Sequence, residues 1–289
     1  MKKLLKIGIP LFVVVLLLGT IGARADYNVT VGTIFTYDVV ASTWTVADGA
    51  NSGTGTGFTF EGTQFPVGTQ VEVEVLAASG SQVDFNETIG SVYDESSATP
   101  FGDALGMVLL MFFPILIGTG SMTWNQTEVE LGPALMGIYF LEPEALGEIF
   151  FELSNESYIS TQFEDPEWTF NQIGGHFDNT STIATFDWVL DMDYVNASLS
   201  TDFGGLFRFK VAYNTATGQV KGYRLDMDYT GTVEGTNRQI TMNQHVEEVG
   251  FDLGNFFYGG GFIPGFEWFI ALPALAILGS IAVIVRKRK

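Results

Sequence analysis

Residues 207–229 read FRFKVAYNTATGQVKGYRLDMDY, and this stretch decides the fold. Apolar and polar residues alternate on both sides of the segment 214–218, which is the pattern of two antiparallel strands joined by a turn. On the polar face, Arg208 and Lys210 lie on the first strand and Asp226 and Asp228 on the second. Opposite charges can attract across such a pair of strands. The stretch therefore predicts a β-hairpin with one apolar and one polar face.

The same alternation predicts further strands at 32–46, 71–75, 186–194 and 240–246, and 81–93 is suited to pair with the second of these. The segment LDMDY at 190–194 recurs at 225–229, as expected for two strands of one sheet that share an in/out pattern. The Gly-rich segment 49–57, GANSGTGTG, predicts a flexible turn region. No Gly-Lys-Ser/Thr follows it, so it is a poor phosphate cradle.

Two segments interrupt the β pattern. Residues 104–118, ALGMVLLMFFPILIG, are apolar throughout, and Pro114 breaks the helical pattern. Fifteen helical residues reach only about 22 Å, so a buried core or lid element is favoured over a membrane-dipping patch or a true span. Residues 143–153 have helical spacing of apolar residues behind Glu142 and Glu144, which predicts an amphipathic helix. The predicted fold class is mainly β (β-rich α+β): antiparallel sheets as a sandwich or half-barrel, with a helical insertion at about 102–154.

The two ends of the chain predict secretion and anchoring. Residues 1–25 combine a basic start, an apolar run and a small-x-small site at Ala23 and Ala25, typical of a cleaved signal peptide rather than an uncleaved anchor. Residues 26–253 then form an extracellular β-rich domain, followed by a Gly-rich spacer at 254–267. The apolar segment 268–285 is long enough for one transmembrane helix, and the basic tail 286–289 places that end in the cytoplasm.

The charge of the external part excludes some partners. Between the two ends the chain has five basic side chains against thirty-three acidic ones, a formal balance of −28. Nucleic acid and anionic lipid headgroups are repelled by such a surface. The sequence has no cysteine, so the fold outside the cell must be held by its own core rather than by disulfides.

Six Asn-x-Ser/Thr triplets support an external, N-glycosylated domain, because such acceptors are used on the surfaces of secreted proteins. They begin at Asn28, Asn86, Asn125, Asn155, Asn179 and Asn196.

The sequence contains no recognisable catalytic motif. His176 and His245 are the only histidines and neither lies in HExxH or triad spacing, so we predict no catalytic residue and no zinc site. A calcium ion is the one metal for which the chain offers ligands, at Asp191, Asp193, Asp226 and Asp228, if their strands are neighbours. These positions lack EF-hand spacing, and a solvated acidic face is the favoured interpretation. We therefore predict no cofactor.

The C-terminal segment, Pro264-Gly265-Phe266 followed by the helix 268–285 and the basic end 286–289, resembles the archaeal surface-protein sorting signals of the Pro-Gly-Phe type. The resemblance implies a membrane sorting enzyme that removes the helix and leaves a lipid anchor. A Gly/Phe-rich spacer stands here in place of the usual Thr-rich stalk, and Glu267 follows the motif. The segment 32–37, GTIFTY, also looks like Asgard-archaeal surface proteins with exchangeable anchors, which implies no activity.

The sequence therefore predicts a membrane-anchored cell-surface protein with a structural or binding role and no catalysis. One alternative is a module that binds a lipid or another hydrophobic ligand, with 104–118 as its lid. It requires an open apolar cavity beside that segment. The second alternative is a surface hydrolase, which requires paired carboxylates in a cleft.

Overall fold

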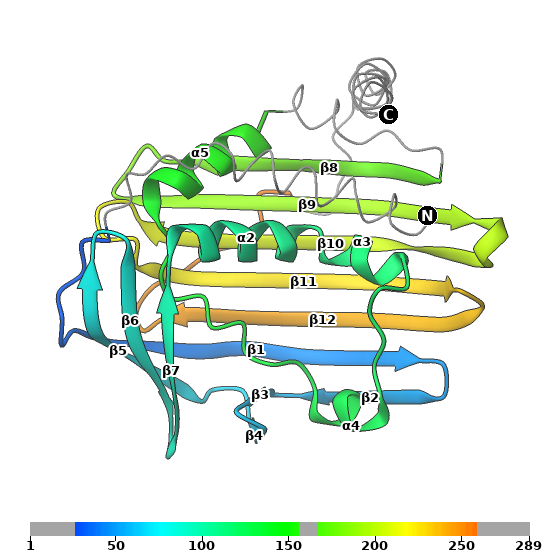
Figure 1. The fold of residues 1–289 in the computed structure, drawn as a ribbon, viewed down its shortest axis with the longest axis horizontal. Helices are drawn as coiled ribbons and strands as arrows, with labels where there is room; N and C mark the ends of the chain where they lie inside the picture. Colours follow the sequence, from blue (N-terminus) through cyan, green and yellow to red (C-terminus); the bar gives the residue numbers. More distant parts are fainter. Residues whose placement is uncertain (1–26, 156–166, 259–289) are drawn as a thin grey trace, which may run out of the picture.

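The computed structural model describes residues 27–155 and 167–258. Its main feature is a ten-stranded antiparallel sheet in the order β7-β6-β5-β1-β12-β11-β10-β9-β8, with β2 paired to β1 beside β5 (Figure 1). The strands are β1 (Ile34–Asp48), β2 (Asn51–Thr56), β5 (Gln70–Ser79), β6 (Gln82–Ile89), β7 (Val92–Ala98), β8 (Trp168–Asp178), β9 (Ile183–Asn196), β10 (Thr201–Asn214), β11 (Val220–Val233) and β12 (Thr236–Glu248). A small hairpin, β3 (Phe58–Phe60) and β4 (Thr63–Phe65), stands apart. The prediction of a mainly β, antiparallel fold is confirmed.

The hairpin predicted at 207–229 is confirmed as β10 and β11. Arg208 lies opposite Asp226 and forms an ion pair with it, as expected. Lys210 instead lies opposite Arg224 and approaches Asp187 of β9 at 3.6 Å, while Asp228 accepts a hydrogen bond from Thr241 of β12. The repeated LDMDY segments lie on β9 and β11, the two neighbours of β10, so the repeat reflects a shared in/out pattern within one sheet.

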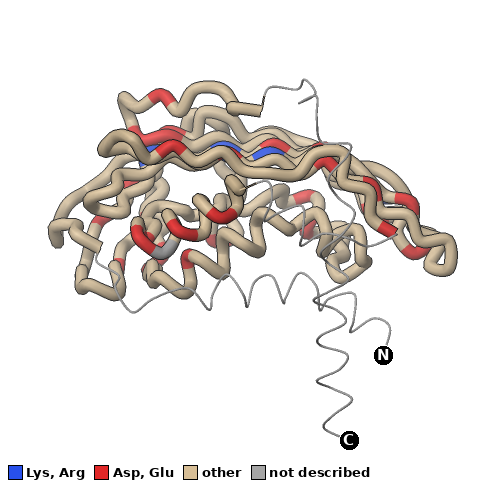
Figure 2. The backbone as a smooth tube through the Cα atoms, turned by 90° about the horizontal axis from the view of Figure 1, so that it is seen from above, with Lys and Arg blue, Asp and Glu red and all other residues tan. Residues whose placement is uncertain are grey.

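One face of the sheet is apolar and is covered by helices. The cross-strand row Trp44, Met242, Met227, Phe207, Leu190 and Ile173 runs over six strands on this inner face. The covering helices are α2 (Pro100–Met111), α3 (Phe113–Gly118), α4 (Gln126–Leu131) and α5 (Pro143–Leu153). They lie on one side of the sheet (Figures 1 and 2). Burial of these apolar faces is the main favourable contribution to the fold.

The ambiguous segment 104–118 forms α2 and α3, packed against the inner face. Proline lacks an amide hydrogen, and Pro114 lies at the start of α3, so the helix is interrupted after Met111. The Met111 carbonyl instead accepts a hydrogen bond of 3.3 Å from the indole of Trp188 on β9. The amphipathic helix predicted at 143–153 is confirmed as α5.

The turn region predicted at 49–57 is wrong, because residues 51–56 form β2 along the second half of β1. The reason is the indole ring of Trp44, which needs a flat surface beside it. A Cβ atom at Gly53 would lie 2.8 Å from this ring and 2.1 Å from the Val129 carbonyl, and one at Gly55 would lie 3.1 Å from the ring. Glycine here serves close packing of a strand rather than flexibility.

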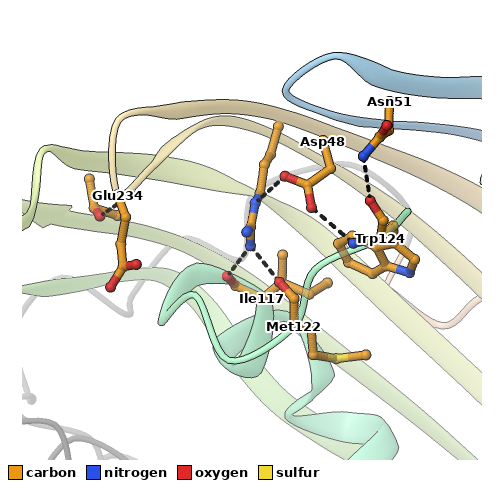
Figure 3. Close-up of polar contacts among 8 residues, drawn as sticks. Asp48, Asn51, Ile117, Met122, Trp124 and Glu234 are labelled. Atoms are coloured by element: carbon orange, nitrogen blue, oxygen red, sulfur yellow. Dashed lines mark hydrogen bonds and ion pairs between the residues drawn. The ribbon is translucent and has the colours of Figure 1, made fainter. Parts of the chain in front are cut away.

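The helical layer is fixed to the sheet by a buried ion pair at one end of β1 and β12. The Arg238 Nε donates to Asp48 at 2.9 Å, and its Nη1 donates to the carbonyls of Ile117 at 3.3 Å and Met122 at 2.7 Å. Asp48 in turn accepts from the Trp124 amide at 2.9 Å (Figure 3). Both charged side chains are almost fully buried. One guanidinium therefore holds together two strands, the end of α3 and the linker between α3 and α4.

The outer face of the sheet is polar and is crossed by residues 254–258, the start of the predicted spacer. The Phe257 amide donates to Asp187 at 2.9 Å, and the Tyr258 hydroxyl donates to the Gly175 carbonyl at 2.7 Å. The ring of Phe256 lies under the guanidinium groups of Arg208 and Arg224, at 4.8 and 4.7 Å. These five residues therefore pack against the sheet, on the side opposite the helices.

Within the described residues, no helix is long and apolar enough to cross a membrane. The predicted signal peptide at 1–25, the helix at 268–285 and the basic tail at 286–289 all lie outside the described residues.

We expect Arg238→Met to lower the free energy of unfolding by about 3–5 kcal/mol, because Asp48 would remain buried without its counter-charge. The matched control is Lys221→Met, which removes the partly exposed ion pair with Glu248 and should cost less than about 1 kcal/mol. Urea unfolding followed by circular dichroism measures both values. Equal small losses would contradict the anchoring role of Arg238.

Candidate ligand cavity

The middle of the inner face is not filled by the helical layer. A cavity of about 520 Å³, here called the central cavity, lies between the sheet and the segments above it. Its floor is made by Trp44 and Val46 of β1, Leu225 and Met227 of β11, and Ile240 and Met242 of β12.

The walls of the central cavity come from the broken helix and the linker that follows it. Leu110 lies in the last turn of α2 and Phe113 begins α3, so both flank the interruption caused by Pro114. Met122 and Trp124 lie on the linker and are, like Met242 on the floor, only partly buried. A side chain in the middle of a covered sheet face is normally fully buried, so solvent reaches Met242 through this cavity.

Two polar side chains on β12 hold the cover above this floor. Arg238 fixes the linker at one end of the strand, and Gln244 fixes the segment 134–136 at the other. The fully buried Gln244 amide donates to the Ala134 carbonyl at 3.2 Å, and its oxygen accepts from the Met136 amide at 3.2 Å. The two residues are six positions apart on the strand, roughly 20 Å. The cover is thus supported at both ends, and Ile240 and Met242 lie between the supports.

A second cavity of about 320 Å³, here called the side cavity, lies between β6, β7, α2 and residues 136–141. Asp103 of α2 and Tyr139 are among its lining residues. Leu110 and Met136 line the side cavity and the central cavity alike, so the two cavities adjoin at these residues. None of the described residues that line either cavity is Lys or Arg.

Two carboxyl groups have strongly raised pKa values: Asp103, which lines the side cavity, and Glu87, which is hydrogen-bonded to the lining residue Tyr139. Burial raises the pKa of Asp103 to about 7, and the neighbouring Glu142 carboxyl acts in the same direction. Hydrogen bonds from the Tyr27 hydroxyl and the Glu142 amide oppose this shift. Burial likewise raises the pKa of Glu87 to about 7, with a smaller contribution from Asp94 and Glu61.

The Glu87 carboxyl accepts a hydrogen bond from the Tyr139 hydroxyl, which favours the charged form and limits its rise in pKa. Both carboxyl groups therefore titrate near neutral pH.

The aspartates considered for calcium do not form one site. Asp191 and Asp193 lie on β9, and β10 separates them from Asp226 and Asp228 on β11. The Asn171 amide donates to both aspartates of β9, at 3.1 and 3.0 Å. Across residues 27–155 and 167–258, no group of three or more metal-binding side chains is found.

The two histidines lie far from the cavities, on the outer face. His176 stacks on the ring of Phe257, with 3.7 Å between the ring centres, and the His245 Nε2 lies 2.7 Å from Glu247. Both belong to one cross-strand row that also contains Asp187, Lys210 and Arg224.

The predicted glycosylation sites differ in exposure. The side chains of Asn28, Asn125, Asn155 and Asn179 are exposed, and Asn86 is half-buried. Asn196 is buried, with its oxygen bonded to the Leu199 amide at 3.1 Å and its amide to the Tyr194 hydroxyl at 3.3 Å. The predicted cleavage site at Ala23 and Ala25 and the motif Pro264-Gly265-Phe266 lie outside the described residues.

Of the residues that line the central cavity, those in 104–118 lie in a segment that the sequence indicated, and the others were not predicted. A signal was available on β12, where the inward positions include Arg238 and Gln244 as well as Ile240 and Met242. Two polar residues at inward positions of an otherwise amphipathic strand indicate buried partners. The hydrogen-bond partners of Arg238 and Gln244 include a linker carbonyl and the backbone of residues 134–136. No sequence pattern identifies these backbone groups as partners.

No protein-family model matches the chain, and a search of curated proteins gives no match. Among solved structures, the chain aligns with the crystal structure of an N-terminal dehydratase from the difficidin assembly line. The identity is 10%, over 82% of this chain and 81% of that one, and the TM-score is 0.10. A likeness at this level carries no argument about fold or function.

We expect the protein to lose stability as pH rises from about 4 to above 7, in part through Glu87. A carboxyl with a raised folded-state pKa holds its proton more tightly in the folded chain, so its contribution is complete below the unfolded pKa and is lost as pH rises through about 7. Glu87→Gln should reduce the difference in unfolding free energy between pH 5 and pH 8 by roughly 1–3 kcal/mol. Urea unfolding at the two pH values measures this difference.

The matched control is Glu95→Gln on the neighbouring strand, which removes one carboxylate from an exposed position. It should leave the pH dependence nearly unchanged. Parallel pH curves for the wild type and Glu87→Gln would contradict the assignment.

Proposed function

We propose that the protein is a non-enzymatic binding protein of the cell surface that holds an apolar ligand in the central cavity. The central cavity, open to solvent and lined mainly by apolar side chains beside α2 and α3, carries this proposal. An opening of this kind beside 104–118 is what the hydrophobic-ligand alternative required. Its volume of about 520 Å³ falls within the range of small-molecule sites, roughly 300–1,000 Å³.

Close packing of protein interiors makes the cavity informative. Cores are packed as densely as organic crystals, and each unfilled volume costs stability. Here the unfilled volume is bordered by large apolar side chains such as Trp44, Phe113 and Trp124. An apolar ligand would supply the packing that these side chains lack, which supports binding as the reason for the opening.

The charges at the site favour a ligand without negative charge. Glu128 lines the central cavity and Asp103 lines the side cavity, whereas no cationic side chain of the described residues lines either. A ligand carboxylate would meet repulsion and no counter-charge.

The same arrangement favours binding over hydrolysis. Carboxylate-dependent hydrolysis uses two carboxyl groups a few ångströms apart in one cleft. Among the described lining residues, each cavity has a single carboxylate, Glu128 in one and Asp103 in the other. The Glu128 carboxylate also accepts a hydrogen bond from the Asn125 amide at 2.8 Å as part of the cap of α4.

We further propose that the domain lies outside the cell and is tethered through its C-terminal end, either by the helix at 268–285 or by a lipid that replaces it after Pro264-Gly265-Phe266. Three features of the sequence support this location: the N-terminal segment with the pattern of a signal peptide, the excess of acidic residues, and the six glycosylation triplets. The tether brings the cavity close to a membrane, where apolar ligands are concentrated.

We expect glycan on the exposed asparagines, such as Asn125 and Asn179, and none on Asn196. Modification needs an accessible side-chain amide, and that of Asn196 is buried in a hydrogen bond to Tyr194. Peptide mapping of the protein extracted from its own membrane measures occupancy at each site. A glycan on Asn196 would contradict the fold around β9, and bare asparagines throughout would contradict the external location.

Ligand binding is tested with the full chain in lipid nanodiscs and 1-bromooctane as probe, because bromine quenches tryptophan fluorescence on contact. Trp44 and Trp124 both line the central cavity. We expect saturable quenching that is lost in the Trp44→Phe/Trp124→Phe variant.

Met242→Phe adds bulk to the cavity floor and should weaken quenching by at least about fivefold. Its matched control is Asn243→Phe, the next residue on the outer face of the same strand. Quenching that is unsaturable, or equal in Met242→Phe and Asn243→Phe, would reject the proposed site.

A further inference from the structure

The two cavities adjoin at Leu110 and Met136. Leu110 of α2 and Met136 line both cavities, and both are partly buried. Methionine is unbranched with three rotatable bonds, so it adapts its conformation readily. An elongated ligand can therefore pass from one cavity to the other when these two side chains change rotamer.

The side cavity places a hydrogen-bonding group at its far end. Asp103 lies seven residues before Leu110 on α2, roughly 10 Å along the helix axis. Its Oδ2 accepts from the Tyr27 hydroxyl and from the Glu142 amide, the latter at 3.2 Å. A carboxyl group offers about four acceptor positions, so Asp103 can accept another hydrogen bond from a ligand.

Two glycines of α2 border the side cavity. Gly102 and Gly106 are exposed and also line the cavity. A Cβ atom at Gly106 would meet no atom within 4 Å, and one at Gly102 would meet only the Thr99 hydroxyl. Glycine inside a helix is unfavourable relative to alanine. Packing within the domain does not require glycine at Gly106, where a side chain would project into open space beside the cavity.

We infer that the ligand is a single long hydrocarbon chain with a neutral hydroxyl head. The chain occupies the central cavity and passes between Leu110 and Met136, and the hydroxyl donates a hydrogen bond to Asp103. A compact ring system would fill the central cavity only, and a carboxylate head would be repelled by Asp103 and Glu142. This inference rests on the proposed function and specifies its ligand class.

The test uses the full chain in nanodiscs and ω-bromoalkan-1-ols of four to sixteen carbons, with quenching of tryptophan fluorescence as the signal. Long alkanols place bromine beside Trp44 and Trp124 while the hydroxyl reaches Asp103, and the four-carbon probe is too short to do both. We compare each variant with the wild type at each length, because partition into the nanodisc lipid is then the same for both.

Asp103→Asn and Gly106→Leu should each weaken binding of the long alkanols about five- to tenfold, the order expected for one lost hydrogen bond or a bulky side chain beside the cavity. Neither should change the binding of 1-bromooctane, which needs the central cavity alone. The matched control is Leu109→Ala, an exposed residue of α2 that lines neither cavity. Gly106→Leu keeps the test valid if Asp103→Asn fails to fold.

The outcomes separate the two proposals. Absence of saturable quenching by 1-bromooctane in the wild type would overturn the proposed function. Normal 1-bromooctane binding, with long alkanols unaffected by both variants, would overturn the extended-chain inference and leave the proposed function standing. An ω-bromo carboxylic acid that binds as tightly as the alkanol of equal length would overturn the hydroxyl head group.

Discussion

The structure depends on how the helical layer is held over one face of a wide sheet. An inner face of aromatic and aliphatic rows must be covered, and the cover is a broken helix with a long linker rather than a second sheet. Arg238 makes this attachment specific, since its hydrogen bonds to one carbonyl of α3 and one of the linker fix the register of the cover in a way that apolar contacts do not. Of the five Lys and Arg residues between the two ends of the chain, Arg238 is the one that binds the cover on the inner face.

Much of the fold follows from sequence alone because a strand with one apolar face has a period of two residues. The segment 207–229 predicted β10 and β11, and the pattern behind Glu142 and Glu144 predicted α5. These elements were predictable because burial on one face and exposure on the other produce a regular spacing of apolar residues in the sequence. The ion pair between Arg208 and Asp226 followed from the same alternation, since opposite residues of a hairpin are close in sequence.

The candidate site could be predicted only in part, because its groups come from segments whose pairing has no local pattern. The apolar segment 104–118 indicated a buried or lid element, but which strands it covers depends on the order β1-β12-β11. The glycines of 49–57 indicated a turn because composition does not reveal that Trp44 needs a strand without side chains beside it. Asp103 and Tyr27 are 76 positions apart, so their contact is a property of the tertiary fold.

The same supports explain why the central cavity remains open although closing it would bury more apolar surface. Collapse of the cover onto Met242 would require the segment 134–136 and the linker to move toward the sheet. That movement would break the hydrogen bonds to Gln244 and Arg238, both buried, and unsatisfied buried polar groups cost about 1–3 kcal/mol each, more for charged ones. The further burial of a few apolar side chains on the floor competes with that cost. The cover is therefore held off the floor by polar interactions at its ends, and an apolar guest can fill the gap without disturbing either support.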